Sequence, residues 1–131
     1  MKSTAVIARF LLGLIFLVFG LNGFLHFIPM PPPTGTAAQF FGALYISNYL
    51  GVIFLLQIIP AILLLLNRYV PLALTLLAPI IVNILLVHLL MVPSGMPLAI
   101  VVTVLWSVVF FSVRSAFAGL WQQRVPVELP R

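Results

Sequence analysis

The polar side chains that could do chemistry in this chain are few, and most of them are amides or imidazoles. Asn22 and His26 are four residues apart, so a helix would present an amide and an imidazole on one face. Such a pair can hydrogen-bond the carbonyl of a quinone or another small polar head group. The alternative is structural: both side chains cap the end of a helix and satisfy the proline-rich segment that follows.

A second imidazole, His88, follows Asn83 by five residues. This spacing separates the two side chains by about 140° around a helix, so we expect them to contact different groups. Two histidines from different helices are able to ligate a haem iron axially. A catalytic zinc needs a third protein ligand, which the chain scarcely offers. We therefore expect no metal site, and a hydrogen-bonding role is favoured over haem ligation.

Gln57 and Trp106 complete the candidate set. Gln57 is the only polar side chain in the centre of its apolar stretch, and Trp106 lies deeper in its stretch than an interfacial tryptophan would. Gln57 either joins two helices by a hydrogen bond or lines a pocket, and Trp106 either packs in the core or covers a ligand. No catalytic residue is assigned, and the candidate ligand-binding residues are Asn22, His26, Gln57, Asn83, His88 and Trp106.

The composition excludes most classes of enzyme. The 131 residues are 64% apolar and only 5% charged, whereas a soluble domain is about a quarter charged. Because Glu128 is the only acidic residue, paired carboxylates and a carboxylate cage for calcium or magnesium are excluded. The absence of cysteine excludes disulfides, thiolate zinc sites and iron–sulfur clusters. The basic residues are scattered singly, which is not a nucleic-acid-binding pattern. The expected environment is a lipid bilayer.

Four apolar stretches approach the length of about 20 residues that a helix needs to cross a bilayer. They lack the alternation of barrel strands, and backbone groups in lipid must be paired internally, so we expect helices. The predicted fold is an all-α membrane protein, a four-transmembrane-helix bundle in one domain, 1–131. The predicted helices are residues 10–28, 49–66, 70–92 and 97–113, with an outer loop at 29–48 in which 39–45 (QFFGALY) form a short interfacial or re-entrant piece.

The positions of the basic residues predict the orientation, because cytoplasmic flanks are enriched in Lys and Arg. Four crossings place all of them on one face: Lys2, Arg9, Arg68, Arg114, Arg124 and Arg131. We expect a multi-pass protein of the inner cell membrane with both termini in the cytoplasm. The candidate polar residues then lie in the outer half, which predicts a polar pocket open to the outer face. With the inner half almost pure hydrocarbon, a continuous channel is not expected.

Three segments of the chain resemble the DoxX-like family of small four-helix membrane proteins, and the resemblance extends over most of the chain. They are residues 22–29 (NGFLHFIP), 68–74 (RYVPLAL) and 77–84 (LAPIIVNI). The resemblance implies a quinone-linked redox subunit or partner protein. It also implies that Asn22, His26, Asn83 and His88 match the polar positions of the family.

The chain departs from this family at two positions, since many members carry Glu at the position of Gln57 and Gly at that of Ala61. Losing the carboxylate removes a proton acceptor from the membrane interior. We therefore predict an accessory subunit that binds a quinone or other lipophilic molecule, is not catalytic alone, and works with a membrane or peripheral oxidoreductase. Four short helices enclose little volume, so a homo-oligomer is expected. The alternatives are a non-catalytic membrane anchor or scaffold and an oligomeric small-solute transporter.

Overall fold

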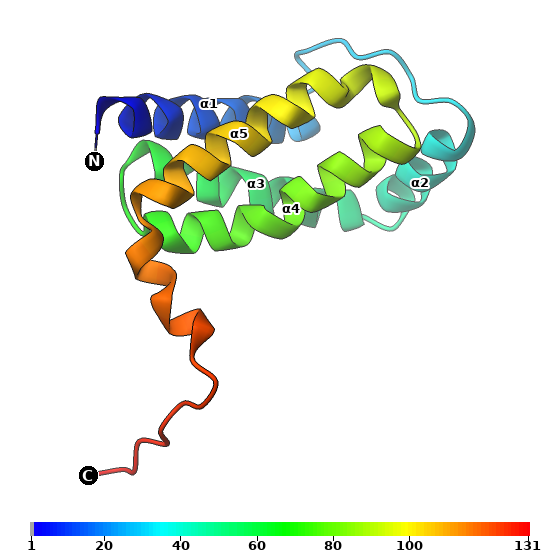
Figure 1. Ribbon diagram of the computed structural model, residues 1–131. Helices are drawn as coiled ribbons and strands as arrows, with labels where there is room; N and C mark the ends of the chain where they lie inside the picture. The colour runs from blue at the N-terminus through cyan, green and yellow to red at the C-terminus, as the bar shows by residue number, and fades with distance from the viewer. Residues whose placement is uncertain (1) are drawn as a thin grey trace.

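The computed structural model describes residues 2–131, and within them the chain forms helices and no strand (Figure 1). The α-helices are α1 (Ser3–Leu25), α2 (Gly35–Ile46), α3 (Tyr49–Leu65), α4 (Val70–Leu90) and α5 (Met96–Ser112). Two short 3-10 helices flank α5: η1 (Pro93–Gly95) precedes it and η2 (Arg114–Trp121) follows it.

Four of the helices form an antiparallel bundle. Helix α1 packs against α3 and α5, and α4 packs against the same two helices, so α1 and α4 lie at opposite corners (Figure 1). The side chains of Leu12, Leu74 and Val109 are fully buried where the helices meet. We call the end where α1 and α4 finish the α2 end, and the end where they begin the tail end. Residues far apart in the sequence are thereby brought together at each end.

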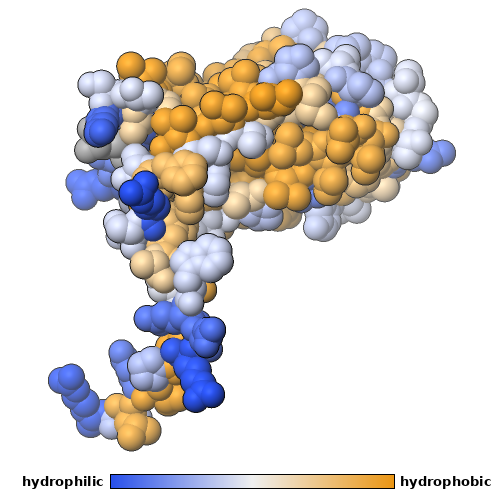
Figure 2. All heavy atoms as spheres, viewed as in Figure 1, coloured by the Kyte–Doolittle hydropathy of each residue, from blue (hydrophilic) through white to orange (hydrophobic). Residues whose placement is uncertain are grey.

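The outside of the bundle is largely apolar. Figure 2 shows hydrophobic residues over the sides of the helices, whereas the most hydrophilic residues lie at the tail end and along the C-terminal segment and paler blue residues cover the α2 end. Three helical segments are long and apolar enough to cross a membrane: α1, α4, and η1 with α5. A fourth is added if α2 and α3, which meet at an angle of 86°, count as one span. The chain is thus all-helical and has the properties of a membrane protein.

Helix α2 corrects the expected outer loop at 29–48, because residues 35–46 of that segment are helical. The sharp bend after α2 is made by Ser47 and Asn48. Asn48 has a left-handed backbone (φ 61°), and the hydroxyl of Ser47 accepts a hydrogen bond from the amide of Tyr49 at 3.3 Å. The aromatic piece at 39–45 therefore lies within a helix nearly perpendicular to α3.

The first predicted helix, 10–28, is displaced toward the N-terminus in the structure, where α1 spans Ser3–Leu25. It ends early because His26 adopts a left-handed backbone (φ 52°) and the Oδ1 of Asn22 accepts the amide of Ile28 at 2.7 Å. It begins early because residues 3–8, which precede Arg9, are already helical. Arg9 is therefore within α1 rather than before it. The boundaries of the other three predicted helices lie within two residues of the observed boundaries of α3, α4 and α5.

Glycines allow α1 to approach α3 closely. A Cβ atom on Gly13 would lie 3.2 Å from the backbone oxygen of Ala61. A Cβ atom on Gly20 would lie 3.4 Å from the backbone oxygen of Phe54. Small residues at helix contacts maximise van der Waals packing between apolar helices, which have no hydrophobic driving force to associate within lipid. These contacts fix α1 relative to α3 from the middle of the bundle to the α2 end.

Candidate functional site

The predicted pair at the end of α1 does not present two free polar groups. Asn22 is buried, and its Oδ1 accepts the hydrogen bond from the backbone of Ile28 described above. His26 is exposed at the C-terminus of α1, and its backbone amide donates to the oxygen of Asn22 at 2.9 Å. The side-chain oxygen of Asn22 therefore holds the segment after α1, as the structural alternative expects for Asn22, whereas His26 contributes only its backbone amide.

The second predicted pair, on α4, also bonds within its own segment. The Nδ2 of Asn83 donates to the oxygen of Pro79 at 2.9 Å. The Nδ1 of His88 lies 3.0 Å from the oxygen of Val92, and a Cβ atom on Gly95 would overlap the His88 ring. Helices α1 and α4 lie at opposite corners of the bundle, and within the described residues no hydrogen bond joins the polar residues of one helix to those of the other. The described residues contain no cluster of three or more metal-ligating side chains.

The last two predicted residues contribute to helix packing. Gln57 is buried on α3 where that helix meets α1, beside Gly20. The indole Nε1 of Trp106 donates to the backbone oxygen of Leu74 at 3.0 Å, which joins α5 to α4. The Trp106 ring also stacks on Phe110, with 5.1 Å between ring centroids. Both residues are therefore held by the packing of the bundle.

An aromatic groove of about 390 Å³ opens at the α2 end, between α1, α2 and α3. The rings of Phe24 and Phe54 meet edge to face on its wall, with centroids 5.9 Å apart. Tyr45 and Asn48 supply its polar side chains, and Asn48 does not use its amide to cap α3. The lining residues are Gly23, Phe24, Tyr45, Ile46, Asn48, Leu50, Gly51 and Phe54.

This aromatic groove combines ring surfaces with a phenol and an amide. Binding sites for small molecules typically have mostly apolar walls and a few polar groups that fix orientation. The arrangement suits a flat lipophilic ring that carries carbonyl or hydroxyl groups. The sequence reasoning missed Tyr45 and Asn48. The available signal was the aromatic content of 39–45 and the position of Asn48 directly before an apolar stretch.

Arg9 is the other polar residue that the sequence reasoning misplaced. Only 5% of its surface is exposed, and its Nη1 donates to the backbone oxygen of Leu64 in the last turn of α3. Its Nε is buried without a hydrogen-bond partner among the described residues, and its guanidinium carbon lies 4.6 Å from the centroid of the Phe10 ring. The signal for its burial was the helix-compatible run of residues 3–8 ahead of it.

No protein-family model, curated protein or solved structure matches this chain. The functional proposal therefore depends on the residues and their geometry. Two features of the described chain stand out: the aromatic groove at the α2 end, and the cluster of basic residues at the tail end.

Proposed function

We propose that this chain is a DoxX-like membrane protein with four spans, α1, α3, α4 and α5, that binds a quinone or a similar lipophilic ring. The apolar outside of the bundle supports insertion. Helix α3 has 17 residues, a length of about 26 Å that nearly matches the hydrocarbon core of about 30 Å. Because α2 is bent by 86° from α3, it lies along the membrane surface when α3 crosses it.

The charge distribution supports an orientation with both termini in the cytoplasm. Arg68 lies in the turn between α3 and α4, at the same end of the bundle as Lys2 and Arg114. The α2 end carries no Lys or Arg. Since positively charged residues are enriched on the cytoplasmic side, the tail end faces the cytoplasm and the aromatic groove faces outward. The membrane is the inner cell membrane.

The single observation that carries the ligand assignment is the aromatic groove with Tyr45 and Asn48 at its edge. Phe24 and Phe54 offer ring surfaces to a quinone head group, and the Asn48 amide and Tyr45 hydroxyl can donate hydrogen bonds to its carbonyl oxygens. The chain has one acidic side chain and no cysteine, so it supplies no pair of carboxylates and no thiol for catalysis. It therefore acts as an accessory subunit, with electron transfer performed by a partner oxidoreductase.

Quinone binding is tested by filling the groove. Gly51 lines the groove, and a Cβ atom on it would lie 3.8 Å from the Phe24 ring, an ordinary contact, so a larger side chain at this position takes up space in the groove. The variant Gly51→Leu is expected to weaken the affinity for decylubiquinone at least about tenfold, because the side chain occupies the ligand's volume. The affinity is measured by equilibrium dialysis of the purified protein in mild detergent.

The matched control is Gly42→Leu, because a Cβ atom on Gly42, within α2, meets nothing within 4 Å. This variant should bind decylubiquinone like the wild type. A second variant, Asn48→Ala, should weaken binding while leaving an alkylbenzene without carbonyl groups unaffected. Unchanged quinone affinity in Gly51→Leu would exclude the groove as the binding site.

The C-terminal segment favours a second function, that of an anchor for a partner protein. After α5 the chain leaves the bundle through η2 and extends away from it (Figure 1). Its side chains include Leu120, Trp121 and Val127, all strongly exposed. Truncation after Gly119, which removes all three of these side chains, should release a stoichiometric partner identified by mass spectrometry but keep quinone binding. If quinone binding is absent and the partner is retained only by the full chain, the anchor function replaces the accessory one.

A further inference from the structure

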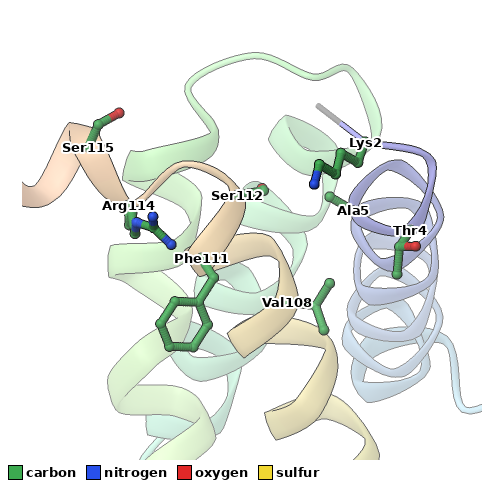
Figure 3. A pocket seen from close by; sticks show the side chains of 8 residues that line it. All are labelled: Lys2, Thr4, Ala5, Val108, Phe111, Ser112, Arg114 and Ser115. Atoms are coloured by element: carbon green, nitrogen blue, oxygen red, sulfur yellow. The ribbon is translucent and has the colours of Figure 1, made fainter.

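A basic groove of about 620 Å³ lies at the tail end, between the start of α1 and the end of α5. Figure 3 shows Lys2 extending from the start of α1 toward the last turn of α5, while Arg114 extends toward α5 from its other side. The groove is far along the bundle from the aromatic groove and shares no residue with it. Its lining residues are Lys2, Thr4, Ala5, Val108, Phe111, Ser112, Arg114 and Ser115.

The charges around this basic groove are all positive. Lys2 and Arg114 are exposed, and the only acidic residue of the chain, Glu128, does not line the groove. The first turn of α1 contains no acidic residue and receives no side-chain cap, so its free backbone amides add to the positive potential. Such a combination of two cations and a helix N-terminus attracts an anion, and phosphate in particular.

The lower wall of the groove is apolar. Phe111 faces outward, with 61% of its surface exposed, whereas Val108 is half-buried against the core of the bundle. Figure 3 shows the Phe111 ring pointing along the bundle, below the level of Arg114. A free phosphate ion would use only the cationic rim. A ligand that matches both the rim and the wall has a negatively charged head and a hydrocarbon chain.

We propose that the basic groove binds one anionic phospholipid of the cytoplasmic leaflet. Lys2 and Arg114 hold the oxygens of the lipid phosphate, and an acyl chain lies along Phe111 and Val108. Basic pockets between transmembrane helices on the cytoplasmic side bind anionic headgroups in this way. This inference depends on the proposed insertion and orientation in the membrane, but it is independent of the quinone site.

The test uses the full chain in mild detergent with dioctanoyl phosphatidylglycerol, dioctanoyl phosphatidylcholine and inorganic phosphate as probes. Affinities are taken from the dependence of the unfolding temperature on probe concentration. Phosphatidylglycerol should bind at least about tenfold more tightly than either other probe. Removing both charges with Lys2→Gln and Arg114→Gln should weaken that binding roughly thirtyfold, given the usual contribution of each basic residue to lipid attraction.

The matched control removes the same net charge outside the groove, with Arg124→Gln and Arg131→Gln in the exposed C-terminal segment. This control should retain wild-type affinity. Equal weakening of phosphatidylglycerol binding in both double variants would overturn the proposal, and so would equal affinity for the two lipids. Inorganic phosphate that binds as tightly as phosphatidylglycerol would overturn it as well, because the lipid chain would then not be recognised. The unfolding temperature without probe shows whether each variant is folded.

Failure of membrane insertion is recognised separately, by washing membranes that contain the wild-type protein with alkaline carbonate. Release of the protein would refute the proposed membrane insertion, and the lipid site with it. Retention of the protein without any preference for phosphatidylglycerol would refute the lipid site alone.

Discussion

The guanidinium of Arg9, near the start of α1, donates a hydrogen bond to the backbone oxygen of Leu64, near the end of α3. The carbonyl groups of the last turn of a helix carry partial negative charge and lack intrahelical donors. The Leu64 oxygen also accepts the backbone amide of Asn67 at 3.2 Å, so the buried Arg9 is its second donor and joins the end of α3 to α1. The described chain offers this arginine no buried carboxylate, so the helix end acts as its partner.

Replacing Arg9 should separate the effects of shape and charge. Arg9→Ala leaves a cavity and removes the second donor to the Leu64 oxygen, and should lower the free energy of unfolding by about 2–4 kcal/mol. Arg9→Met fills much of the same volume and should recover most of this loss. The reason is that the free-energy cost of burying the guanidinium charge offsets much of what its hydrogen bond contributes, and methionine has neither. Unfolding by SDS titration measures both. The exposed Arg68 provides the control, since Arg68→Ala should leave stability unchanged.

The close approach of α1 and α3 predicts opposite effects for one substitution at two mid-helix glycines. A Cβ atom on Gly20 would lie 2.7 Å from the Cγ1 of Ile58, whereas one on Gly42 meets nothing. Gly20→Ala should lower the free energy of unfolding by about 1–3 kcal/mol through overpacking. Gly42→Ala should raise it by up to about 1 kcal/mol through helix propensity. Equal effects in SDS titrations would show that the helices are not in close contact at Gly20.

Trp106 should contribute to stability through its hydrogen bond as well as its ring. Trp106→Phe retains an aromatic ring next to Phe110 but removes the donor to the Leu74 oxygen. We expect a loss of about 1 kcal/mol, the usual net value of one hydrogen bond. Trp121 is 82% exposed, so Trp121→Phe should have no effect on unfolding. A Trp106→Phe variant as stable as the wild type would mean that the indole does not join α5 to α4.

The bundle was predictable where hydrophobicity alone determines the structure. The apolar stretches that became α3, α4 and α5 are bounded by Asn48, Asn67 and Pro93, which interrupt helices by known backbone preferences. The start of α1 was not predictable in this way. A charge is normally a sign of the membrane edge, but Arg9 is buried because it finds a carbonyl on another helix, 55 residues away in sequence.

The candidate site was less predictable, because spacing does not show which hydrogen bonds a side chain has already made. Asn83 bonds to Pro79 on its own helix, and His88 bonds to Val92 just past the end of that helix, so one polar atom of each is already engaged locally before any ligand is considered. The aromatic groove depends on the bend at Asn48, which brings α2 beside α3. In the sequence, Ser47 and Asn48 are visible only as two polar residues between apolar stretches, which does not reveal the angle of the bend.

His26 provides the prediction that best separates a structural role from binding. Its backbone is left-handed (φ 52°), a conformation that costs a residue with a side chain about 1–2 kcal/mol relative to glycine. His26→Gly should therefore raise the unfolding temperature, whereas His26→Ala should not, because alanine has the same strain. Since His26 does not line the aromatic groove, both variants should bind decylubiquinone like the wild type. Loss of quinone binding in a more stable His26→Gly protein would instead identify the imidazole as part of the ligand site.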